Sequence, residues 1–169
     1  MLSFWRKEKI NMKKNPTDNH LNMTETLHHI DIEFKIATTS REFGDAKNLF
    51  QLYAASLEID LSFQNFSDEL ETIDKQYNKP TGALLLAYIN GTAVACAGMR
   101  QLDVETAELK RMYVQPAYRQ HRLGRKLLER IVAIARERHY KRIRLDTLPT
   151  MTRAQNLYRS FGFYEVPSY

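Results

Sequence analysis

The stretch VQPAYRQHRLGRK, from Val114 to Lys126, decides how this chain folds. A β-branched residue followed by a proline-containing turn is typical of the end of a strand, because proline cannot continue a ladder of backbone hydrogen bonds. A helix is predicted next, since apolar side chains recur at helical spacing from Leu123 to Ala135. The free N–H groups at the start of this helix, surrounded by cations, can bind a phosphate group. The spacing alone equally allows a solvated basic helix terminus.

Strand and helix patterns alternate on both sides of this stretch. Asn90-Gly91 predicts a tight hairpin between two of the strands. Strands are predicted at 31–37, 83–89, 92–100, 104–114 and 142–147, with a last strand after Phe163. Helices are predicted at 40–57, with Ser40 as a candidate N-cap, at 67–78, at 122–139, and from Thr150 or Thr152 to Ser160. The order predicts one α/β domain in which helices cover a mixed sheet.

Composition narrows the class of protein. The chain has 169 residues, of which 43% are hydrophobic, which is enough for one domain. Its one cysteine, Cys96, excludes an internal disulfide, and it is interpreted as a buried structural thiol. Residues 1–30 are polar and aperiodic and predict a mobile tail before a domain at 31–169. No run is apolar enough for a membrane span or a secretory signal, so a cytoplasmic protein is expected.

Positive charge is concentrated in the second half of the chain. From Lys110 to Arg153 there are 13 Lys or Arg against three acidic residues, which suits a phosphate-bearing partner. No aromatic residue interleaves the basic ones for base stacking, so a nucleic-acid partner is not expected. No metal-ligand spacing stands out, and no metal is expected.

Two motifs resemble those of the GNAT acetyltransferase superfamily. Arg119-Gln-His-Arg122-Leu-Gly124, after Val114-Gln-Pro-Ala-Tyr118, is similar to the superfamily's Arg/Gln-x-x-Gly-x-Gly/Ala motif. Ala154 to Phe163 looks like its A-x-x-L-Y-x-x-x-G-F ending. The resemblance spans roughly 31–167. It implies an α/β (α+β) fold with a mixed, mostly antiparallel central sheet flanked by helices, and acetyl-CoA as cosubstrate.

The resemblance also implies which residues bind acetyl-CoA. The pantetheine arm would pair with the backbone of Met112, Tyr113 and Val114. The pyrophosphate would lie on the following turn, at Arg119, Gln120, His121, Arg122, Leu123, Gly124, Arg125 and Lys126. Two features depart from the superfamily. Arg122 stands where it prefers its first glycine, and the sequence ends where members continue into one more strand beside the fifth. We therefore expect an exposed edge there, or one completed by a partner chain in a homodimer.

Three residues are candidates for proton transfer. Tyr158 matches the superfamily's general-acid tyrosine. Glu108 occupies a base position of some members, and Asp146 that of others. Strict alternation would place Glu108, Lys110, Met112 and Val114 on one face of the strand. Which carboxylate is the base stays open.

The predicted function is N-acetyl transfer from acetyl-CoA to a primary amine of a small molecule or a protein, by direct attack in a ternary complex. The alternative is a catalytically weak acyl-CoA-binding or sensor module, favoured by Arg122 and the missing strand. Acidic residues between Leu57 and Lys79 either attract a cationic amine or are ordinary solvated helix charge. No membrane partner is expected.

Overall fold

A seven-stranded sheet forms the centre of the protein. The computed structural model describes residues 2–8, 30–57 and 65–167. The strand order is β2-β3-β4-β5-β6-β1-β7, and every neighbouring pair is antiparallel except β5 and β6, which run parallel. The strands are β1 (Ser3–Glu8), β2 (Ile32–Ile36), β3 (Ala83–Ile89), β4 (Thr92–Gln101), β5 (Thr106–Val114), β6 (Arg142–Thr147) and β7 (Tyr164–Val166). The predicted mixed, mostly antiparallel sheet is confirmed.

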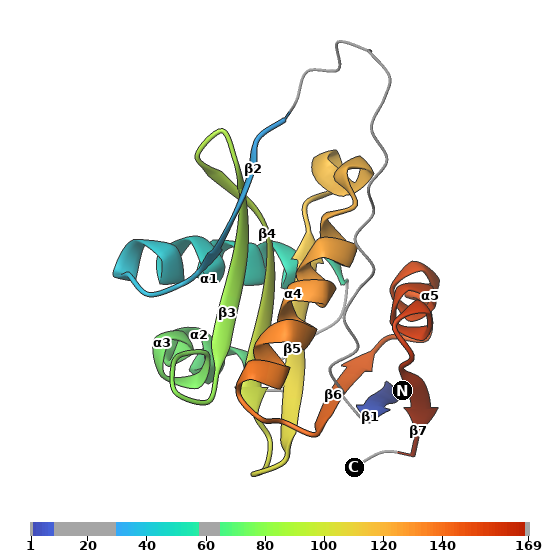
Figure 1. Cartoon of the computed structure of the whole chain (residues 1–169). Helices are drawn as coiled ribbons and strands as arrows, with labels where there is room; N and C mark the ends of the chain where they lie inside the picture. The colour runs from blue at the N-terminus through green and yellow to red at the C-terminus, as the bar shows by residue number, and fades with distance from the viewer. Residues whose placement is uncertain (1, 9–29, 58–64, 168–169) are drawn as a thin grey trace, which may run out of the picture.

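Helices cover both faces of this sheet (Figure 1). They are α1 (Ser40–Ser56), α2 (Phe66–Glu71), α3 (Ile73–Gln76), the 3₁₀ helix η2 (Pro116–His121), α4 (Leu123–Glu137) and α5 (Thr152–Ser160). The apolar stripe of α4, including Leu127 and Ile131, packs in a cluster with β4 and β5. On the opposite face Phe50 of α1 packs in a second cluster with Leu84 and Leu86 of β3. The two clusters make one three-layered domain.

Local sequence signals account for several element boundaries. Thr39 caps α1 in a reciprocal capping box with Glu42, one residue before the predicted cap Ser40. Asn90 and Gly91 both have positive φ, 50° and 76°, as the tight hairpin turn between β3 and β4 requires. Cys96 is buried, and this burial raises the pKa of its thiol, which confirms the interpretation as a structural residue.

The N-terminal residues depart most from the sequence prediction. Ser3–Glu8 form β1, which lies between β6 and β7 and pairs with both. Trp5 anchors the strand with 1% of its surface exposed. A mobile tail is therefore the wrong prediction for these six residues, because one buried tryptophan and two strand ladders outweigh a charged local sequence. The rest of the predicted tail up to residue 29 lies outside the described residues.

β1 also changes the expectation for the sheet edge. The predicted open edge lay beside the strand at 142–147, now β6. That position is occupied by β1, which pairs with β6 from Ser3↔Thr147 to Glu8↔Arg142. The exposed edge at β6 was thus a wrong prediction, because a strand from the other end of the chain completes the sheet. A homodimer stays a prediction, but an open sheet edge at β6 is no longer a reason for it.

Candidate active site

A cavity of about 630 Å³ lies where β5 and β6 separate. The two parallel strands pair only at Thr106↔Arg142, Ala107↔Ile143 and Glu108↔Arg144, and then diverge (Figure 1). From Leu109 to Val114, the β5 edge on this side therefore has no ladder partner in β6 and faces the cavity. Unpaired N–H and C=O groups along a strand can hydrogen-bond an extended, amide-bearing ligand.

A β-bulge decides which β5 side chains face which way. Register shifts between Cys96 and Gly98 of β4, and Arg111 opposite them has a φ of 53°. A non-glycine residue in this left-handed region costs roughly 1–2 kcal/mol. The bulge places Lys110 and Arg111 on the same side of the sheet, although they are neighbours in the sequence.

The contacts of β5 show the resulting faces. Glu108 is linked through Arg100 to Gln76 of α3, and Arg111 bonds Glu69 of α2. Met112 and Val114 instead pack against the cluster on the α4 side. The predicted shared face of Glu108, Lys110, Met112 and Val114 is therefore wrong, because the extra residue of the bulge reverses the alternation.

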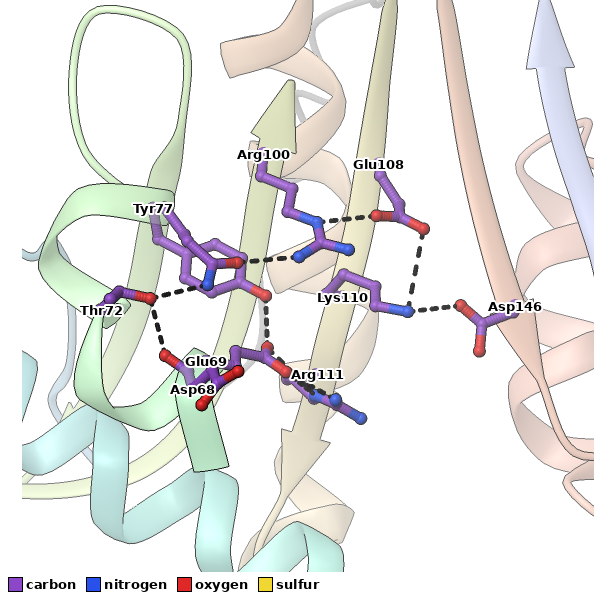
Figure 2. A network of polar contacts seen from close by, with 10 residues as sticks. Asp68, Glu69, Thr72, Tyr77, Arg100, Glu108, Lys110, Arg111 and Asp146 are labelled. Carbon is purple, nitrogen blue, oxygen red and sulfur yellow. Dashed lines mark hydrogen bonds and ion pairs between the residues drawn. The ribbon is translucent and has the colours of Figure 1, made fainter. Parts of the chain in front are cut away.

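Lys110 connects the two candidate carboxylates (Figure 2). Its Nζ lies 2.8 Å from Oδ1 of Asp146 and 3.7 Å from Oε1 of Glu108. Glu108 is also held by Arg100, whose Nε is 2.8 Å from Oε2, and the Glu108 side chain is only 8% exposed. Asp146 lines the cavity, whereas Glu108 does not. The structure thus brings Asp146, and not Glu108, to the place where a substrate can bind.

A second buried ion pair joins Arg111 of β5 to Glu69 of α2. Nε and Nη2 of Arg111 bond both carboxylate oxygens of Glu69 at 2.6–3.2 Å, and each side chain is 4% exposed. The hydroxyl of Tyr77 donates to Glu69, and burial, followed by the charge of Glu69, raises the pKa of Tyr77. The ring of Phe66 packs against the Arg111 guanidinium. These contacts hold α2 on the sheet.

Three tyrosines line the same cavity: Tyr53, Tyr113 and Tyr158. Tyr158 of α5 is 6% exposed and packs on Phe163, with ring centroids 5.8 Å apart. Burial, and then the charges of Tyr53 and Asp146, raise the pKa of Tyr158, so its hydroxyl stays protonated at neutral pH. Tyr53 of α1 lines the cavity as well, and burial raises its pKa to about 12. The structure therefore places one carboxylate and three phenols around one space, and burial raises the pKa of two of these phenols, Tyr53 and Tyr158.

The turn after β5 is the 3₁₀ helix η2, and Arg122 follows it directly. This residue has a φ of 55°, which explains why a glycine suits the position and what the arginine costs. Of the predicted cofactor residues, Met112, Tyr113, Val114, Arg119 and Gly124 line the cavity. Gln120, His121, Arg122, Leu123, Arg125 and Lys126 are not among its lining residues.

Some residues of the turn have contacts of their own. Leu123 is fully buried in the core, so its side chain is not available to a ligand. The Arg125 guanidinium lies over the ring of Phe161, at 5.1 Å from its centroid. Lys126 lines a separate hollow beside β2.

Several lining residues escaped the sequence reading. Tyr53 gave no signal, because its position on α1 fits the apolar stripe of the core. The bulge that brings Arg111 to the cavity also has no local signature. The other missed residues are Ser56, Leu109, Lys110 and Thr147, together with Thr150, Met151, Thr152, Arg153, Ala154 and Leu157 around the start of α5.

The acidic residues of α2 and α3 do not form a lip on the cavity. Glu69 is buried against Arg111, and Glu71 and Asp74 line a different hollow beside α1. Glu58 and Asp60 lie outside the described residues. The described residues therefore give no support to a cationic amine attracted by this region.

Comparison with known proteins identifies the family. The model of the Acetyltransferase (GNAT) family matches residues 47–163. The chain belongs to the GNAT acetyltransferase family. An uncharacterized N-acetyltransferase of Schizosaccharomyces pombe is 34% identical over 141 residues, which cover 82% of this chain and 86% of the relative. Like that relative, this GNAT protein is an acyltransferase by family.

Solved structures agree with this assignment. A GNAT acetyltransferase of Staphylococcus aureus is 26% identical, with a TM-score of 0.70 over 81% of this chain and 87% of the other. A predicted acetyltransferase of Clostridium acetobutylicum, solved with acetyl-CoA, shares the fold at 18% identity, with a TM-score of 0.59 over 82% of this chain and 94% of the other.

Within residues 2–8, 30–57 and 65–167, no group of three or more His, Cys, Asp or Glu side chains could hold a metal ion. No helix in the same ranges is long and apolar enough to cross a membrane.

Proposed function

We propose that the protein transfers an acetyl group from acetyl-CoA to a primary amine by direct attack in a ternary complex. The observation that carries the proposal is the meeting of Asp146 and Tyr158 at one cavity, in the gap between β5 and β6. A carboxylate can take a proton and a buried phenol can give one, which are the two proton transfers that amide formation requires.

The residues present fit acetyl-CoA. The unpaired β5 edge at Met112–Val114 suits the amides of a pantetheine arm. Lys126 N–H is the first of α4 to bond back along the helix, to the carbonyl of Arg122, so the preceding N–H groups have no partner within it. Arg119 and Arg153 line the cavity and would add charge-assisted bonds to phosphate oxygens. The Clostridium structure with acetyl-CoA supports the same ligand for this fold.

In the proposed reaction the chain's own groups move the protons. The acceptor ammonium first loses one proton to solvent, and the neutral amine nitrogen then forms a bond to the acetyl carbonyl carbon as Asp146 takes a second proton. The carbon–sulfur bond then breaks, and Tyr158 gives its proton to the leaving sulfur. A backbone N–H of β5 near Val114 would stabilise the oxyanion formed between these steps. The proton on Asp146 returns to Tyr158 through solvent, which restores both groups.

The alternative of a weak acyl-CoA-binding or sensor module rests on Arg122 and the missing strand. Both supports are weaker in this fold, because β1 fills the strand position and Arg122 does not line the cavity. Relatives named N-acetyltransferases also favour the enzyme.

Calorimetric titration of acetyl-CoA, with dephospho-coenzyme A alongside, tests binding, and release of free thiol in the presence of amines tests transfer. We expect micromolar binding and amine-dependent thiol release. Binding without thiol release for any amine would favour the sensor module. A folded sample that binds neither compound would contradict both functions.

A further inference from the structure

The cavity presents more positive than negative side chains to a bound substrate. Its lining includes four cationic residues and one acidic residue, Asp146. Arg119 and Arg153 belong to the proposed phosphate contacts. Lys110 and Arg111 remain, side by side on the wall formed by the β5 bulge. Arg111 pairs with Glu69, and Lys110 pairs with Asp146 at 2.8 Å and with Glu108 at 3.7 Å; of these three acids only Asp146 lines the cavity. The carboxylates of Glu69 and Glu108 therefore lie outside the cavity in which a substrate would bind.

Lys110 and Arg111 also have donors to spare. An ammonium group can donate three hydrogen bonds, and Nζ of Lys110 makes one within the described residues, to Asp146. The 3.7 Å separation from Glu108 is an ion pair but too long for a second hydrogen bond. Among the described residues, Arg111 bonds through Nε and Nη2, and no hydrogen bond is recorded for Nη1. Remaining donors beside a polar cavity suit an oxyanion of the substrate.

From this arrangement we propose that the amine acceptor carries a carboxylate next to its amine, as a free amino acid does. This inference rests on the proposed acetyl transfer. The amine of the acceptor lies at Asp146, and its carboxylate bonds Lys110 and Arg111. Lys110 and Asp146 are 2.8 Å apart, so the two opposite charges of an amino acid would meet two opposite charges of the wall. A neutral or cationic analogue leaves the remaining donors of the two cations without an acceptor from the substrate.

The test compares each free amino acid with its C-terminal amide, at saturating acetyl-CoA, by the rate of thiol release. The pair has nearly the same size and differs in the negative charge. We expect kcat/KM for at least one free amino acid to exceed that of its amide by about 100-fold, because sites built to hydrogen-bond a substrate group reject analogues that lack it.

The variant Lys110→Met then tests whether Lys110 and Arg111 cause the preference for a free carboxylate. The ratio between acid and amide is expected to fall to below about 10-fold, chiefly through a higher KM for the acid. Lys35→Met, on the distant strand β2, is the matched control and should keep the ratio of the unmodified protein. A preserved ratio in Lys110→Met would overturn the assignment.

Other outcomes separate the two proposals. Amides or simple amines acetylated as fast as amino acids would overturn the carboxylate-bearing acceptor and leave acetyl transfer intact. Acetyl-CoA binding with no thiol release for any amino acid would also overturn it. A folded protein that fails to bind acetyl-CoA would refute the proposed function itself.

Discussion

Replacing Trp5 with alanine tests whether the N-terminal strand belongs to the folded core. Removing a fully buried large aromatic side chain costs about 3–5 kcal/mol, and Trp5 is 1% exposed. The Arg159 guanidinium, 4.8 Å from the Trp5 ring, adds about 0.5–1 kcal/mol. Nε1 of Trp5 is buried with no hydrogen-bond partner among the described residues, so its removal returns about 1 kcal/mol. The expected net loss is about 2.5–5 kcal/mol.

Urea unfolding followed by circular dichroism measures this loss. With a slope of about 2 kcal/mol per molar urea, the midpoint should fall by about 1.2–2.5 M. Trp5→Phe keeps the ring packing and removes the unpartnered N–H, so we expect a change below about 1 kcal/mol. Val104→Ala, at a residue 86% exposed, is the surface control. A loss below about 0.5 kcal/mol for Trp5→Ala, as for a surface residue, would refute the placement of β1.

Three further predictions concern the site. Tyr158→Phe should lower kcat by about 100-fold, the lower range for a general acid, while calorimetry finds acetyl-CoA affinity within about twofold; an unchanged kcat would exclude the acid role. Arg122→Gly should be more stable than Arg122→Ala by about 1 kcal/mol in urea, because only glycine is unstrained at a φ of 55°; equal stabilities would argue against this backbone conformation. Burial raises the pKa of Tyr53 from 10 to about 12, so its contribution to stability is complete below pH 10 and is lost as pH rises towards 12. Tyr53→Phe should therefore lose less stability between pH 9 and 12, by at most about 2.7 kcal/mol for two pKa units, and parallel curves in urea would contradict the shift.

Elements with strong local signals were predictable from the sequence. The helix predicted at 122–139 is α4, which is one residue shorter at its start and two shorter at its end. It was predictable because six apolar residues at helical spacing can all be buried on one side only in a helix. The hairpin at Asn90-Gly91 followed from the φ values that this pair adopts easily. The two motifs placed the cofactor turn and Tyr158 on the expected elements, and both border the cavity.

Features that depend on contacts distant in sequence were not predictable in this way. β1 is a strand because Trp5 finds a core supplied by β6, β7 and α5, about 140 residues later. The segment Ser3–Glu8 contains three consecutive charged residues, and no local pattern in it predicts a buried strand. Likewise, the sequence favoured Glu108 over Asp146 as the base without deciding between them, and the cavity lining shows that Asp146 faces the cavity and Glu108 does not.

The β5 bulge illustrates how such a distant contact selects a structure. Without the extra residue, strict alternation would turn Arg111 towards the apolar cluster under α4, where an unpaired buried charge costs several kcal/mol. The left-handed conformation of Arg111 costs only roughly 1–2 kcal/mol and directs its guanidinium to Glu69 instead. The Glu69–Arg111 pair therefore favours the bulged register over the regular one. The same bulge brings Lys110 and Arg111 together at the cavity. The positive charge on this side of the cavity therefore follows from the Glu69–Arg111 ion pair.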